Sequence, residues 1–255
     1  DEKYGFRDYR GGGRSSGRET IGRVAAGAVA VKLLGQMGIE LYAYASAIGG
    51  IAMDRDSFNL EERDNNPFAM PDAGAALKIK KYADRKLEEC NSMGGIIECV
   101  VKNMPAGIGE PVFDKLDANL AKAIMSIGAV KGVEIGDGFA AADSTGLENN
   151  DAFRMKDGHI VKQTNHAGGI LGGMSDGSDI ILRAAVKPTP SIAATQHTVN
   201  KAGEEIDISI HGRHDPMIVP RAVVVVEAMT AITLVDMLFM GMTSRLDRIA
   251  DFYKR

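Results

Sequence analysis

The spacing of hydrophobic and polar residues along the chain predicts four helices. Between residues 72 and 90, alanine and leucine recur at roughly helical intervals among charged residues, which indicates an amphipathic helix with one buried face. Long apolar helices are expected over residues 17–37 and 221–242, and a shorter one over residues 116–127. These segments supply most of the helical content that the pattern predicts.

Strand-like segments lie between these helices. We expect strands at residues 39–45, 95–102, 130–135, 180–187 and 204–211, and a hairpin over residues 153–164 that turns on Asp157 and Gly158. Because strands and helices mix without a regular βαβ alternation, the order favours an α+β fold with an antiparallel sheet over a doubly wound fold. No linker or short repeat interrupts the chain, so we expect residues 1–255 to form a single domain.

The longest apolar run covers residues 222–242 and contains two carboxylates, Glu227 and Asp236. Charged side chains are costly at the centre of a bilayer, so this run predicts a buried helix rather than a membrane span. Glu227 is expected to be a buried hydrogen-bonding partner and not a catalytic group.

Composition narrows the classes of function. Hydrophobic residues make up 45% of the chain and charged residues 25%, as in ordinary soluble domains, while 30 glycines and the lack of tryptophan predict a core of small aliphatic side chains. The net charge of -4 argues against general nucleic-acid binding. Cys90 and Cys99 are too few for a disulfide framework or a metal site, so we expect reduced thiols and a cytoplasmic protein.

One loop carries the strongest local signal for a ligand. Residues 11–20 join three glycines to two arginines and two serines, and lead into the first predicted helix. Ser16 and Glu19 have the spacing of a capping box, and the remaining N–H groups at the helix start would form a seat for an anion. Arg14 and Arg18 would add forked donors suited to phosphate or carboxylate. The alternative is an ordinary capped helix after a turn.

Three later segments are further candidates for binding or catalysis. Glycine-rich residues 165–175 allow close approach of a flat ligand, although their spacing is not that of a dinucleotide-binding fingerprint. Residues 187–191 place one lysine and two hydroxyls after a strand, which suits either a phosphate cradle or a strand cap with an exposed lysine. In residues 211–216, Asp215 lies between basic residues that can tune its pKa for acid–base work, or it belongs to a salt-bridged turn. His211 and His214 lack a third metal ligand at suitable spacing.

Ordered motifs spread over nearly the whole chain carry a resemblance to one family. They occupy residues 4–16 and 18–20, 109–116, 129–136, 165–173, 187–191 and 212–216. On these motifs the chain resembles chorismate synthase. The resemblance implies an α+β fold in which central helices are sandwiched between antiparallel sheets, and assembly into a homotetramer.

The resemblance also implies an activity. The family catalyses a 1,4-elimination of phosphate from 5-enolpyruvylshikimate 3-phosphate to give chorismate, in the shikimate pathway of aromatic amino acid biosynthesis. The reaction requires reduced FMN, from a separate source of reduced flavin, without net redox change. No nucleic acid, membrane or metal partner is implied.

Site residues follow from the matching motif positions. The resemblance assigns FMN contacts to Arg14, Ser15, Ser16, Gly128, Ala129, Gly172, Lys187, Pro188, Thr189, Pro190, Ser191 and Arg213. It places Arg18 and Arg213 near the anionic substrate, and assigns Asp215 as the base that takes a proton from a flavin ring nitrogen. At Gly128 many family members carry asparagine, and Gly17 stands where alanine is common.

Family members carry a further N-terminal portion before the match to Tyr4, with two histidines thought to act as acids and with substrate-gripping arginines. Its lack in this sequence leaves two alternatives to a complete enzyme. One is a chain that binds FMN or a phosphorylated ligand without lyase turnover. The other, an FMN oxidoreductase, is weaker because no nicotinamide site is evident.

Overall fold

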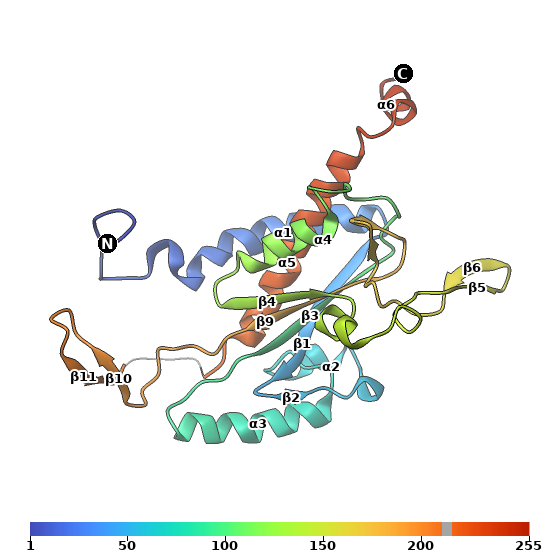
Figure 1. Cartoon of the computed structure of the whole chain (residues 1–255). Helices are drawn as coiled ribbons and strands as arrows, with labels where there is room; N and C mark the ends of the chain where they lie inside the picture. The colour runs from blue at the N-terminus through green and yellow to red at the C-terminus, as the bar shows by residue number, and fades with distance from the viewer. Residues whose placement is uncertain (211–215, 255) are drawn as a thin grey trace.

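A five-stranded antiparallel sheet is the framework of the computed structural model, which describes residues 1–210 and 216–254 (Figure 1). Its strand order is β2-β1-β3-β9-β4, and every neighbouring pair is antiparallel. The strands are β1 (Glu40–Ile48), β2 (Ile51–Ala52), β3 (Gly95–Lys102), β4 (Val130–Ile135) and β9 (Ile180–Val186). The predicted α+β class with an antiparallel sheet is therefore confirmed.

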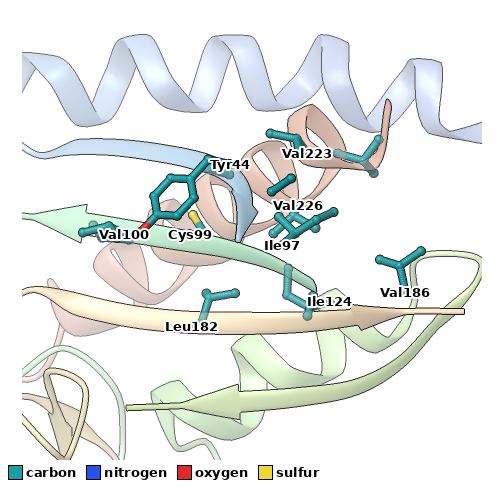
Figure 2. Packing of buried hydrophobic residues seen from close by; sticks show 14 of the residues in the cluster. Tyr44, Ile97, Cys99, Val100, Ile124, Leu182, Val186, Val223 and Val226 are labelled. Carbon is teal, nitrogen blue, oxygen red and sulfur yellow. The ribbon is translucent and has the colours of Figure 1, made fainter. Parts of the chain in front are cut away.

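The strands β1 and β3 contribute to the core on both faces of the sheet, because four and five consecutive residues are buried in them, whereas β9 is buried on one face. In β9, Ile180, Leu182 and Ala184 are fully buried, whereas the residues between them are partly exposed. Successive strand residues point to opposite faces, so in β9 the buried set marks the face that is turned toward the core. Figure 2 shows Val223 and Val226, from the long helix α5, beside Ile97 of β3.

The helix α5 (Val219–Gly241) packs against β1 and β3 on one side and against α1 (Thr20–Gln36) on another, with α4 (Leu116–Met125) beside it (Figure 1). By length and hydropathy it is the one helix of the described residues that could span a membrane, but 44% of its most apolar window is buried inside the protein. A helix that is apolar all round suits such a core position. Glu227 accepts a hydrogen bond from the Ala43 N–H at 3.0 Å, which confirms the predicted hydrogen-bonding partner, although its side chain is only partly buried.

The contact between α1 and α5 requires a glycine. A Cβ atom at Gly27 would lie 2.3 Å from the Cβ of Ala228 and 2.6 Å from its Cα. No such contact is tolerated without movement of one helix, because the nearest atoms belong to the backbone and to a short side chain. Gly27 therefore sets how closely the two helices approach.

The smaller elements surround this framework. They are α2 (Glu62–Asn65), α3 (Ala73–Glu88), α6 (Leu246–Tyr253), and three hairpins: β5 (Phe153–Lys156) with β6 (His159–Lys162), β7 (Ile170–Leu171) with β8 (Met174–Ser175), and β10 (Gln196–Val199) with β11 (Glu205–Ile208). Short 3-10 helices occur at Gly13–Ser15 (η1), Gly17–Glu19 (η2), Arg55–Ser57 (η3) and Gly138–Asp143 (η4).

Several predicted elements are confirmed with shifted bounds. The charged helix expected at residues 72–90 is α3, and Asp72 caps it by accepting a hydrogen bond from the Ala75 N–H at 3.0 Å. The hairpin turns at Asp157 and Gly158, both with positive φ. The pairing of β7 with β8, the strand β10 and the helix α6 were not predicted.

The five-stranded sheet lies on one side of the layer formed by α1, α4 and α5 (Figure 1), and among the described residues no second large sheet lies on the other side of that layer. The outward face of α1 instead exposes apolar side chains: Ile21 is 73% exposed and Val29 67%. Only one half of the implied sandwich is therefore present in the described part of the chain.

A substitution at Gly27 tests the helix contact. Gly27→Ala should lower the free energy of unfolding by about 1–3 kcal/mol, because the added methyl group overpacks the contact with Ala228. The matched control is Gly35→Ala in the same helix, where an added Cβ meets nothing within 4 Å; that change should raise stability by up to about 1 kcal/mol. Denaturant unfolding measures both, and equal effects of the two changes would contradict the close approach.

The two cysteines should differ in reactivity. Burial raises the pKa of Cys99 to about 12, whereas Cys90 is exposed. Because the thiolate is the reactive form, a thiol-specific disulfide reagent at pH 8 should modify Cys90 in the folded protein and reach Cys99 after denaturation. Peptide mass mapping identifies the labelled residue. Rapid labelling of Cys99 in the folded chain would show that the sheet–helix core is not closed.

Candidate active site

A pocket of about 560 Å³ lies where three segments that are distant in sequence meet. The segments are the 3-10 turns before α1 together with its first turn, the turn between α4 and β4, and the chain that follows β9; Ile218, just before α5, completes the lining. The lining residues are Arg14, Ser15, Ser16, Gly17, Glu19, Thr20, Arg23, Ser126, Gly128, Ala129, Lys187, Pro188, Thr189, Pro190, Ser191 and Ile218. Of the predicted FMN residues that the structure describes, it thus brings together all except Gly172.

The first wall is built from η1 and η2. The Ser15 hydroxyl donates to the Gly12 carbonyl at 2.6 Å and so closes the first turn. The Ser16 hydroxyl accepts from the Arg18 N–H at 3.3 Å and caps the second. These short-range bonds turn the chain sharply just before α1 and hold the hydroxyl-rich segment against the pocket.

The predicted capping box is wrong. Ser16 caps η2 and not α1, which begins at Thr20 with no side-chain cap on its first turn. The Glu19 carboxylate accepts from the Arg23 Nε–H at 2.8 Å instead of reaching back to Ser16. A cation one helical turn away attracts a carboxylate more strongly than a neutral N–H group does, so the arginine determines where Glu19 points.

The second wall is the turn after α4. Ala129 has a φ of 74°, a left-handed conformation that is uncommon for a residue with a Cβ atom. In this conformation its carbonyl accepts from the Lys187 N–H at 2.9 Å. The turn therefore attaches the second wall directly to the third.

The third wall, residues 187–191, contains a polar atom with no partner. The Thr189 carbonyl accepts from the Ser92 hydroxyl at 2.6 Å, which fixes the backbone. The Thr189 Oγ1 is buried, yet it makes no hydrogen bond in the described protein. Because a buried hydroxyl without a partner is costly, this atom indicates a position that a ligand would satisfy.

The charge of the pocket is positive. Arg14, Arg23 and Lys187 line it together with one carboxylate, Glu19, which is paired with Arg23. Neither Arg14 nor Lys187 has a salt-bridge partner within residues 1–210 and 216–254. The start of α1 lies at the same pocket, so the positive end of its dipole adds to the attraction for an anion.

The other predicted site residues lie elsewhere or are not described. Gly172 is in the turn between β7 and β8. Just before β7, the Gly168 carbonyl accepts from the Ile181 N–H near the start of β9, whereas Lys187 follows the end of that strand. A strand of seven residues spans roughly 20 Å, so the structure does not bring Gly172 to the pocket. Arg18 is on η2 between two lining residues but does not itself line the pocket. Arg213 and Asp215 lie outside the described residues.

The glycine-rich segment 165–175 has another structural use. A Cβ atom at Gly168 would lie 2.2 Å from the backbone nitrogen of Gly136, so glycine permits a close backbone contact here. Next to it, the His166 Nδ1 lies 2.6 Å from the Asp137 carboxylate. Gly168 and Gly169 thus serve close chain packing at the start of β9.

Sequence reasoning missed Arg23, Ser126 and Ile218 as lining residues. For Arg23 a signal was present, since its spacing from Glu19 is that of a helical ion pair. Ser126 and Ile218 gave none, because their place in the pocket depends on how α4 and α5 pack.

The fold is of the α+β class, and its pocket gathers cations and hydroxyls from separate segments. A family model described as chorismate synthase matches residues 1–239. The chain therefore belongs to the chorismate synthase family, a family of lyases, and the resemblance noted from its motifs is confirmed.

Individual relatives agree with this membership. The chain is 68% identical over 255 residues to a chorismate synthase of Lachnospira eligens and 66% identical to that of Agathobacter rectalis. In both comparisons all of this chain matches and it covers 70% of the relative's length. A solved structure titled as chorismate synthase superposes with a TM-score of 0.73 at 31% identity, over 93% of this chain and 69% of that one.

Proposed function

We propose that the pocket holds reduced FMN and that the chain serves the conversion of 5-enolpyruvylshikimate 3-phosphate to chorismate. The observation that carries the proposal is the convergence of residues 14–16, 128–129 and 187–191 on one pocket. Each of these segments carries a motif that the family resemblance assigns to FMN, although the segments are far apart in sequence. Chance would not be expected to gather them.

The residues present fit a phosphorylated flavin. The unpartnered Thr189 hydroxyl and the cations Arg14 and Lys187 suit a phosphate group, which accepts several charge-assisted hydrogen bonds. The pocket volume of about 560 Å³ falls within the usual range for small-molecule sites. We assign Arg14, Lys187 and Thr189 to holding the cofactor, with Ser16 and Ser191 as further donors, while Ser15 closes the turn that presents them.

When bound and reduced, FMN supplies transient electron density to the substrate with no net redox change. In the elimination, a C–O bond to phosphate and a ring C–H bond break, and a C=C bond forms. We propose that Arg18 and Arg213 orient the anionic substrate, since guanidinium groups pair well with carboxylate and phosphate. Asp215 is proposed as the base that takes up a proton, in a basic segment suited to tuning its pKa.

A second candidate is a chain that binds FMN without turnover. The observation that favours it is the extent of the match, because this chain covers 70% of the length of its relatives. Groups that act from the remainder of the family's sequence are not among these 255 residues. Flavin binding and turnover are therefore separate questions for this polypeptide.

We further propose a homotetramer in the cytoplasm. The exposed apolar face of α1, with Ile21 and Val29, would be covered in an assembly. Gly172 could then meet flavin only in the pocket of a second copy, since it lies at the far end of β9 from its own pocket. The free thiols Cys90 and Cys99 suit a reducing compartment.

Changes at Thr189 test the function. Thr189→Val keeps the shape but removes the hydroxyl, and it should weaken FMN binding about tenfold, the equivalent of one hydrogen bond to a charged group. Thr189→Ser is the matched control and should bind almost as well as the wild type. Without FMN, the valine variant should be at least as stable as the wild type, because an unsatisfied buried hydroxyl has been removed.

Flavin titration under anaerobic conditions measures the binding, and chorismate absorbance with phosphate release measures turnover on 5-enolpyruvylshikimate 3-phosphate. Binding with turnover supports the lyase. Binding without product supports the second candidate. A wild-type chain that binds no flavin would refute both.

A further inference from the structure

Arg23 joins two walls of the pocket through hydrogen bonds that no motif predicted. Its Nη1 donates to the Ser126 hydroxyl at 2.6 Å, and its Nη2 donates to the Ser126 carbonyl at 3.2 Å. Its Nε donates to the Glu19 carboxylate at 2.8 Å. One guanidinium group on α1 thus binds both the turn before its own helix and the end of α4.

The end of α4 is a favourable place for this cation. Ser126 is the C-terminal cap of α4, so its carbonyl carries part of the negative end of the helix dipole. The Ser126 hydroxyl also donates to the Ala123 carbonyl at 2.6 Å, which fixes its orientation and leaves an oxygen lone pair for Arg23. Arginine suits the position because its planar fork can meet two oxygens of one residue, which a lysine cannot do in the same way.

From Ser126 the connection continues to the other walls. Gly128 and Ala129 follow within three residues and line the pocket, and the Ala129 carbonyl holds the Lys187 N–H at 2.9 Å. The route from α1 through Arg23, Ser126 and Ala129 to Lys187 therefore contacts all three walls. A change at its first member would alter the spacing between them.

The ion pair with Glu19 indicates that Arg23 is not the main group that attracts a phosphate. Its charge is already compensated by a carboxylate at 2.8 Å, and its side chain is 23% exposed. Arg14 and Lys187 have no such partner among the described residues, so they are better placed to attract a phosphate. Arg23 is built into the wall and is not the principal anion-binding group.

We propose that Arg23 is a positioning residue for the flavin pocket, acting through Ser126 and not by contact with the flavin phosphate. The proposal rests on the proposed function, because it takes the pocket to be the flavin site. If Arg23 sets the spacing of the walls, its loss should weaken binding of FMN and of riboflavin by the same factor. A residue that touches the phosphate would affect FMN alone.

The test is a set of flavin titrations on the full chain, with FMN and with riboflavin. Arg23→Gln should raise the dissociation constant of both ligands about tenfold, since it removes charge-assisted bonds. Ser126→Ala, which keeps the backbone carbonyl, should raise both about threefold, as expected for one lost hydrogen bond. Lys32→Gln, an exposed cation on the same helix, is the matched control and should change neither.

The double variant separates positioning from general destabilisation. If Arg23 acts through Ser126, the losses of the two changes should not add, because the residues are coupled. The dissociation constants of the double variant, Arg23→Gln with Ser126→Ala, should then exceed those of Arg23→Gln alone by no more than about twofold. Thermal unfolding confirms that each variant is folded at the assay temperature. If Arg23→Gln does not fold, the FMN and riboflavin titrations of Ser126→Ala test the proposal.

Four results would overturn the inference. They are unchanged binding in Arg23→Gln and Ser126→Ala, a loss for FMN with none for riboflavin, a double variant with fully additive losses, and a wild-type chain that binds neither ligand. The last result also refutes the proposed function. The first three leave it intact, because the wild type still binds flavin.

Discussion

The close contact between α1 and α5 is the constraint on which the rest of the structure depends. Gly27 allows the two helices to approach until no side chain fits between them, since a Cβ atom added at Gly27 would lie 2.3 Å from the Cβ of Ala228. Since α5 is itself fixed on β1 and β3, this contact fixes α1 relative to the sheet. The beginnings of both helices then lie at one pocket, with Thr20 and Arg23 from α1 and Ile218 just before α5.

The pocket is formed by segments that lie at the ends of helices and strands. A turn before α1, a turn after α4 and the chain after β9 each present polar groups that the regular elements cannot use internally. The left-handed Ala129 and the carbonyl it offers to Lys187 join two of these ends. Rigid elements thus position a polar site whose groups come from connecting segments, an arrangement common to binding sites.

Much of the fold could be predicted from the sequence because local patterns determine it. The helix α3 follows from its periodic alanines and from Asp72 at its start, and the hairpin turn at Asp157 and Gly158 follows from residues that tolerate positive φ. The start of α1 could not be predicted in the same way. Ser16 and Glu19 satisfy the capping-box spacing, but the tertiary setting of Arg23 gives Glu19 another partner.

Most residues of the site could be predicted from the sequence, but the hydrogen bonds that join them could not. Motifs indicated Arg14, Lys187 and Thr189. The bond from Arg23 to Ser126 instead joins residues that are 103 positions apart in sequence, and it depends on how α1 and α4 pack. The separation of Gly172 from Lys187 follows from the predicted strand between them, although motif matching alone placed both at one ligand. Long-range pairing is where sequence patterns give least information.

Hydrogen–deuterium exchange with and without FMN tests the central claim most directly. Flavin should slow amide exchange in residues 14–20, 126–129 and 187–191 together, and leave the exposed hairpin of β5 and β6 unchanged. Saturable flavin binding with protection that maps outside these three segments would contradict the account.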